Sequence, residues 1–100
     1  MPTLKCSLIN DLWVKKETKL DDFNLAVERV KRLKKELEEA GMSDIDRRIK
    51  RSSEYRSMTR KANELEAFLT DIERRYGISP PWILDALKVV CETGVEEVTF

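Results

Sequence analysis

The sequence predicts an all-α protein built on an antiparallel, coiled-coil-like helical hairpin, followed by a third, short helix. Three observations predict this fold. Charged residues make up 38% of the 100 residues, well above the usual quarter, which is typical of long solvated helices. Only 3 Gly and 3 Pro are present, whereas an all-β fold needs a turn about every ten residues. Finally, apolar residues recur at alternating spacings of three and four, the pattern of a coiled-coil seam.

The first helix of the hairpin is expected over 19–40. Thr18 followed by Asp21 resembles an N-terminal cap with an acid in the first turn, and Gly41 is suited to the position after a helix C-terminus. The predicted seam residues are Phe23, Ala26, Val30, Leu33, Leu37 and Ala40.

The second helix is expected over 44–76, because Ser43 and Asp46 repeat the capping pattern and Gly77 follows the last apolar residue. The turn between the two predicted helices, at 41–43, is so short that the helices are expected to be antiparallel neighbours. Its seam comprises Tyr55, Met58, Ala62, Leu65, Leu69, Ile72 and Tyr76. Ile45 and Ile49 do not share this phase, so the helix either shifts its register near Ser52 or breaks there with Ser53 as a new cap. We expect a continuous helix.

A third helix is expected over 80–93, with Ser79 as cap, Pro80 in the first turn and Gly94 after the end. Its apolar face would be Ile83, Ala86, Leu87, Val90 and Cys91. The tail 94–100 alternates weakly and could form a short strand against 4–8 in the N-terminal segment 1–17. Alternatively, Leu8 to Trp13 form a short amphipathic helix, and the pattern leaves this choice open. The whole chain, 1–100, is read as one helical domain.

Composition argues against an enzyme and against a cofactor or metal site. The chain contains no histidine, which is the commonest general base and metal ligand, and it has no Gly-rich phosphate-binding loop. Cys6 and Cys91 are expected to be free thiols of a cytoplasmic protein. The longest apolar runs have three residues, against the roughly 20 that a membrane-spanning helix needs, so no membrane association is expected.

The apolar stripe over 62–76 is wider than a simple seam, because Phe68 adds to it, and a wide stripe touches more than one neighbour. We therefore expect a protein–protein interaction module, an adaptor, assembly factor or inhibitor, that self-associates, with a dimer favoured, and binds a protein partner. Trp82 is assigned to this surface because tryptophan is enriched in interface hot spots, although burial in the core is its commoner fate. The expected partner-binding residues are Leu65, Phe68, Leu69, Ile72 and Trp82.

The alternative function is binding of nucleic acid by the basic part of the second helix. Residues 41–61 carry seven bases and three acids, a net charge of +4, and rows of Lys and Arg can neutralise phosphates. The expected residues are Arg47, Arg48, Lys50, Arg51, Arg56, Arg60 and Lys61. The competing interpretation is internal neutralisation, since an antiparallel hairpin would bring the acidic stretch 36–39 beside the first four of these bases.

Overall fold

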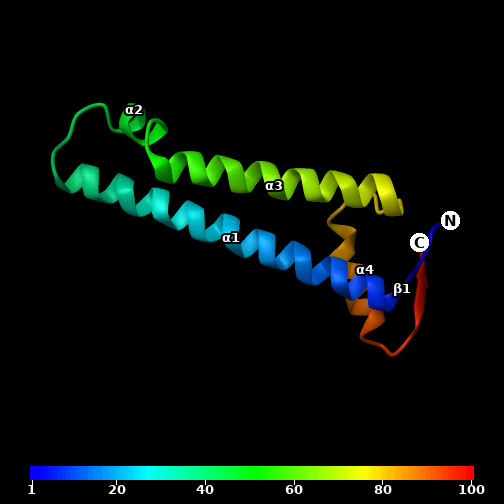
Figure 1. Ribbon diagram of the computed structural model, residues 1–100. Coiled ribbons are helices and arrows are strands. Elements are labelled where there is room, and N and C mark those ends of the chain that lie inside the picture. The colour runs from blue at the N-terminus through cyan, green and yellow to red at the C-terminus, as the bar shows by residue number, and fades with distance from the viewer. The chain divides into compact units, whose positions relative to one another are not determined.

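The computed structural model describes residues 1–100 and confirms a mostly helical fold with a short ribbon formed by the two chain ends (Figure 1). The elements are β1 (Thr3–Lys5), α1 (Cys6–Glu39), α2 (Ile45–Lys50), α3 (Ser53–Tyr76), α4 (Ile83–Cys91) and β2 (Glu97–Thr99). They form two compact units, which we describe separately. The terminal module comprises Met1–Thr18 and Glu66–Phe100, and the hairpin unit comprises Lys19–Leu65.

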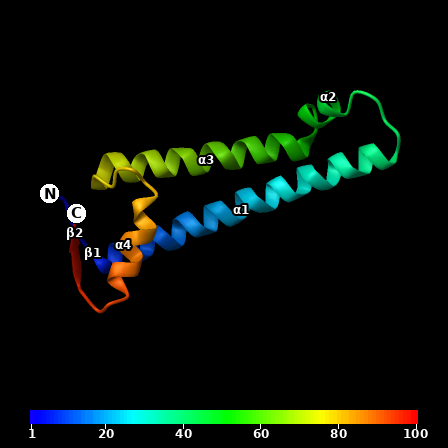
Figure 2. The ribbon, with the colours of Figure 1, turned by 180° about the vertical axis from the view of Figure 1, so that it is seen from behind.

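In the terminal module the two chain ends pair as an antiparallel ribbon (Figures 1 and 2). Leu4 lies opposite Val98, and the Phe100 backbone N–H donates to the Pro2 carbonyl at 3.0 Å. Immediately after β1 the chain enters α1, whose first turn is tied to the tail by a hydrogen bond from the Cys6 N–H to the Glu96 carbonyl. Both alternatives for the N-terminal segment are therefore realised, the strand over 3–5 and the helix from Cys6 onward.

The core of the terminal module is built from all of its helical parts. Six side chains are buried there: Ile9, Leu12, Ile72, Ile78, Leu84 and Leu87. The apolar face expected for the third helix is partly wrong, because α4 begins at Ile83 instead of residue 80 and buries Leu84 together with Leu87. Ala86 and Val90, which were expected on the buried face, are exposed.

In the hairpin unit α1 and α3 are joined by a turn and the short helix α2 (Figure 1). The expected end of the first helix is confirmed. Gly41 has φ +68°, its N–H donates to the Glu38 carbonyl, and the Met42 N–H donates to the Leu37 carbonyl. These two bonds form a Schellman motif, which satisfies carbonyls that the helix end would otherwise leave without partners.

The expected start of the first helix, at residue 19, is wrong. The Thr18 hydroxyl does not cap a helix but donates to the Val14 carbonyl at 3.0 Å, inside a helix that began at Cys6. A threonine hydroxyl has both options, to cap a helix or to bond back one turn, and the residues around Thr18 did not distinguish them.

The expected continuity of the second helix is also wrong, since Arg51 and Ser52 separate α2 from α3. Ser52, instead of Ser53, caps α3: its hydroxyl oxygen accepts the Tyr55 N–H at 3.1 Å. Because α2 is a separate helix, Ile49 can be buried without sharing the phase of the α3 seam. The change of phase seen in the sequence is therefore a break.

Candidate interaction surfaces

A polar cluster holds α4 against the start of α1 within the terminal module. Lys16, only 7% exposed, pairs with Asp85 and with Glu17, and the indole N–H of Trp13 donates to the same Asp85 oxygen at 2.8 Å. Lys88 lies over the Trp13 ring, 4.4 Å from its centroid, and pairs with Glu92 at 2.6 Å. These charges are satisfied inside the module.

The cluster shifts the pKa of both members of its central pair. Burial by itself would lower the pKa of Lys16, but the hydrogen bonds to Asp85 and Glu17 outweigh it, so the net shift is upward from 10.5. The hydrogen bond from Lys16, supported by that from Trp13, lowers the pKa of Asp85 despite partial desolvation. Both shifts favour the charged pair.

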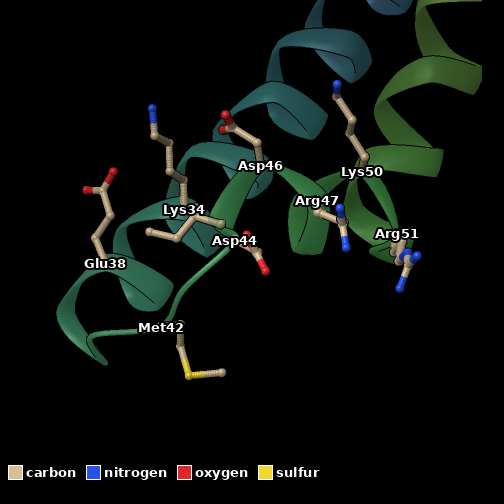
Figure 3. Close-up of a pocket in the computed structure, with 9 residues that line it drawn as sticks. Lys34, Glu38, Met42, Asp44, Asp46, Arg47, Lys50 and Arg51 are labelled. Atoms are coloured by element: carbon tan, nitrogen blue, oxygen red, sulfur yellow. The ribbon is translucent and has the colours of Figure 1, made fainter.

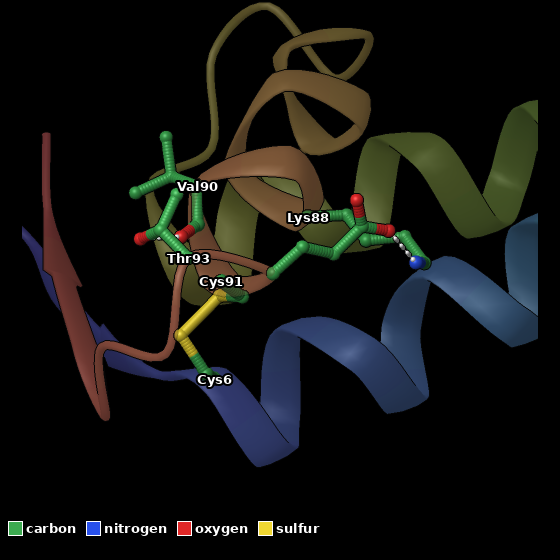
Figure 4. Close-up of a disulfide and its surroundings, with 6 residues drawn as sticks. Cys6, Lys88, Val90, Cys91 and Thr93 are labelled. Carbon is green, nitrogen blue, oxygen red and sulfur yellow. Dashed lines mark hydrogen bonds and ion pairs between the residues drawn. A yellow bond between two sulfur atoms is a disulfide. The ribbon is translucent and has the colours of Figure 1, made fainter.

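The expectation of two free thiols is wrong, because Cys6 and Cys91 form a disulfide (Figure 4). It joins the first residue of α1 to the last residue of α4, with their Cα atoms 5.5 Å apart. The sequence separation of 85 gave no hint of this proximity, which depends on the pairing of the two chain ends. This disulfide within the terminal module was not predicted from the sequence.

The stripe over 62–76 is largely used within the chain. Ile72 is 1% exposed and belongs to the terminal core, so it is not available to a partner in this conformation. Phe68 packs against the same core, and Leu65 and Leu69 are half-buried. Trp82, for which burial in the core was the commoner expectation, is 72% exposed.

The hairpin unit, in contrast, leaves its apolar seam only partly buried. Of its apolar side chains only Ala26 and Ile49 are buried. We call its half-buried apolar residues on α1 and α3 the open seam; they are Leu20, Phe23, Val27, Val30, Leu33, Leu37, Tyr55, Met58, Ala62 and Leu65.

Leu20 and Val27 make the open seam wider than the sequence analysis recognised. Val27 follows Phe23 by four residues and precedes Val30 by three, so it borders the seam on one side of α1. In a helix that faces the core of a bundle, apolar residues typically occupy the two seam positions of each seven-residue repeat and one position beside them. This flanking pattern is visible in the sequence and could have identified the surface.

Six of the seven basic residues assigned to nucleic acid have no ion pair in the hairpin, so the pairing of the first four with the acidic stretch 36–39 is absent. None of the seven ion pairs includes Arg47, Arg48, Lys50, Arg51, Arg56 or Arg60. Lys61 pairs with Glu64, and Arg48 donates to the Ser43 carbonyl at 2.9 Å.

Part of this basic set surrounds an open pocket of about 730 Å³ at the end of the hairpin, which we call the tip pocket (Figure 3). Its lining combines four cations, three acids and two apolar side chains: Lys34, Arg47, Lys50, Arg51, Glu38, Asp44, Asp46, Met42 and Ile45. The side chains of Lys34 and Lys50 extend toward the top of the view, whereas those of Arg47 and Arg51 do not (Figure 3). Arg56, Arg60 and Lys61 do not line the pocket, so the expected seven residues do not form one site.

A second apolar surface lies on the terminal module, on the side of α4 that faces away from the core. We call it the α4 face; it consists of Trp82, Ala86, Val89 and Val90. Val89 is 61% exposed, and Trp82, just before the helix, is more exposed still. The helical period places residues 82, 86 and 89 on one side of α4, and Leu84 and Leu87 on the opposite side. No charged residue lies in this row.

The comparisons with known proteins give no relative: no family model, no curated protein and no solved structure matches the chain. No group of three or more Cys, Asp or Glu side chains is placed to hold a metal ion. No helix combines the length and the apolar character that crossing a membrane requires. The surfaces described above therefore carry the functional argument by themselves.

Proposed function

We propose that this protein is a non-enzymatic protein–protein interaction module, in the manner of an adaptor or assembly factor, that self-associates through the open seam. The observation that carries the proposal is the contrast between the two units. The terminal module buries six apolar side chains in one core, whereas the hairpin unit buries only two.

Two helices cannot cover a wide apolar stripe, because each seam residue contacts the opposite helix on one side only. Two hairpins stacked seam to seam would form a four-helix bundle, in which all such residues have neighbours on both sides. Completing the burial of a half-buried leucine or phenylalanine contributes about 1 kcal/mol at the usual area coefficient. With five such residues among the ten of the open seam on each copy, a second copy is the simplest cover.

Substitution of Val27 by aspartate tests this proposal. Val27 borders the seam without lying at its centre, so the change should leave the hairpin helical while placing an unpaired carboxylate in the bundle interface. Such a buried charge should weaken self-association at least tenfold, or about 1.4 kcal/mol. Sedimentation velocity and circular dichroism of the same samples report the mass and the helix content.

Asn24→Asp is the matched control, because it introduces the same charge on α1 at an exposed position away from the seam. It should self-associate like the wild type. An unchanged mass for Val27→Asp, or equal weakening by both substitutions, would remove the open seam from the interface.

Nucleic acid is the second candidate ligand, supported by the basic residues without ion-pair partners. The structure favours it less, for two reasons. Glu38, Asp44 and Asp46 share the tip pocket with the cations. In addition, the remaining bases do not line that pocket, so no continuous basic track follows from the geometry.

The cytoplasmic location expected from the sequence stays a prediction, and the thiol argument for it no longer holds. Disulfides persist mainly in oxidising compartments, so the Cys6–Cys91 bond favours such an environment over a reducing one.

A further inference from the structure

The α4 face is unusual for this chain, because it is a helix surface without charge in a sequence with 38% charged residues. The charges that α4 does carry are engaged elsewhere. Asp85 binds Lys16 and Trp13, and Lys88 binds Glu92. Between these ion pairs, the indole of Trp82 and the side chains of Val89 and Val90 are exposed, with the exposed but paired Asp85 beside them.

The surroundings of this face are acidic. The terminal module has six bases and nine acids, a net charge of −3. Three of the acids, Glu92, Glu96 and Glu97, follow α4 in the sequence, and all three are exposed. Glu92 is paired with Lys88, whereas Glu96 and Glu97 have no ion pair. A matching surface would therefore be basic with an apolar centre.

The hairpin unit of the same chain has these properties. It has thirteen bases and ten acids, a net charge of +3. At its end, Met42 is 38% exposed and Ile45 is half-buried, both in the lining of the tip pocket. Four cations line the same pocket, Lys34, Arg47, Lys50 and Arg51, and none of them has an acidic partner within ion-pair distance. They outnumber the three acids of the lining, so the pocket carries a net charge of +1.

The chemistry of the pocket suits an indole ring. Lysine and arginine cations are attracted to the face of tryptophan within about 6 Å, and a methionine sulfur makes favourable contacts with an aromatic ring. The terminal module already contains one such arrangement, with Lys88 lying 4.4 Å from the centroid of the Trp13 ring. A pocket of about 730 Å³ has room for one indole side chain.

We propose that the α4 face of one copy docks on the tip pocket of a second copy, with Trp82 entering the pocket and the acids after α4 facing its cations. The inference builds on the proposed self-association but uses different residues. Because the two contacting surfaces differ, the contact is heterologous, and it extends from copy to copy unless the geometry closes a ring. Joined to seam pairing, it would make the protein an assembly factor that forms chains.

Two loss-of-contact variants allow a direct test. Trp82→Ser removes the indole at the residue just before α4, outside the helix itself, so the helix should be retained. Arg47→Glu with Arg51→Glu reverses the charge of the pocket at two exposed residues. Both are made in the Val27→Asp background, so that seam pairing does not contribute.

In that background each variant alone should sediment as a single chain, since every contact needs one intact face and one intact pocket. An equimolar mixture of the two should form a heterodimer that cannot extend. Because few side chains take part, the contact belongs to the weak class below about 1,200 Å² of buried surface, and we would mix the chains at ~200 µM. Raising the salt from ~50 mM to ~0.5 M should weaken the heterodimer at least tenfold, because attraction between exposed charges is screened.

The controls change the same chemistry elsewhere. Val14→Ser removes another exposed apolar side chain of the terminal module, and Arg56→Glu with Arg60→Glu makes an equal charge change outside the pocket. Val14→Ser is added to the Arg47→Glu with Arg51→Glu chain, whose α4 face is intact, and Arg56→Glu with Arg60→Glu is added to the Trp82→Ser chain, whose pocket is intact. The heterodimer should then form with an affinity within about twofold of that without these additions.

Two results would overturn the inference. One is a mixture that sediments no faster than either variant alone. The other is binding of a labelled 20-nucleotide DNA or RNA that Arg47→Glu with Arg51→Glu abolishes while no heterodimer forms, which would assign the pocket to nucleic acid. Neither result bears on the open seam, whose failure would instead appear as an unchanged mass for Val27→Asp.

Discussion

Lys16 is the one charged side chain that the fold buries, and its partners explain how a charge is tolerated there. A buried ammonium without a carboxylate would be strongly unfavourable, but Asp85 and Glu17 both pair with it. Since Lys16 comes from α1 and Asp85 from α4, the pair fixes how these two helices meet in the terminal module.

Replacing Asp85 by asparagine should destabilise the terminal module by about 1 kcal/mol, because Lys16 loses its charged partner while Asp85 itself is partly exposed. Urea unfolding followed by tryptophan fluorescence measures the change. Asp71→Asn is the matched control, since Asp71 belongs to an exposed pair with Arg75 one turn away on α3. The control should cost at most about 0.5 kcal/mol, and an equal loss in both variants would contradict a special role for Asp85.

The effect of Asp85 should depend on pH in a defined direction. Its pKa is lowered in the folded state from the ordinary value of 3.8, so its stabilisation is present above that value and is lost as the pH falls through the lower folded-state pKa. Lys16, whose pKa is raised, keeps its contribution up to 10.5 and loses it only at higher pH. The difference in unfolding free energy between wild type and Asp85→Asn should thus be constant near pH 7 and shrink below about pH 4. A difference that grows on acidification would contradict the pairing.

At the scale of elements, the stability of the terminal module should depend on whether the disulfide is intact. Cys6 and Cys91 close a loop with a sequence separation of 85, for which the chain-entropy model gives a stabilisation of roughly 4.6 kcal/mol. Cys91→Ser should lower the free energy of unfolding by up to this amount. The same shift should appear when the wild type is unfolded in a thiol reductant.

The double variant with both cysteines replaced by serine is the control for this prediction. Its stability should not respond to the reductant, because no disulfide remains to be broken. A wild type equally stable with and without reductant would show that the bond is not formed in solution or does not stabilise the module.

The elements of the hairpin could be predicted from the sequence where a long periodic pattern met a specific stop signal. The seam from Phe23 to Leu37 and the glycine after it gave the end of α1 correctly. The break at Arg51 and Ser52 was visible as a change of phase, but a shifted continuous helix has the same pattern, so the choice needed the structure. Which face of α4 is buried was also not predictable, because the helix is apolar on both sides and only packing selects Leu84.

At the scale of the whole molecule, the sequence is neutral overall, but its charge is divided unevenly between the two units. The net charge of zero hides −3 on the terminal module and +3 on the hairpin unit. The assignment of residues to units depends on the pairing of the chain ends, which sequence spacing did not determine. For the same reason Ile72 was assigned to a partner surface, although the N-terminal turns of α1 cover it within the chain.

The central claim is that the hairpin unit is completed by a second copy. Sedimentation equilibrium of the wild type tests it most directly, at ~0.5 M salt, where contacts between exposed charges are screened. The account predicts a mass about twice the chain mass of 11.7 kDa, held as the concentration falls into the micromolar range. A single-chain mass at every concentration up to ~100 µM would leave no association stronger than about 5.5 kcal/mol and would contradict it.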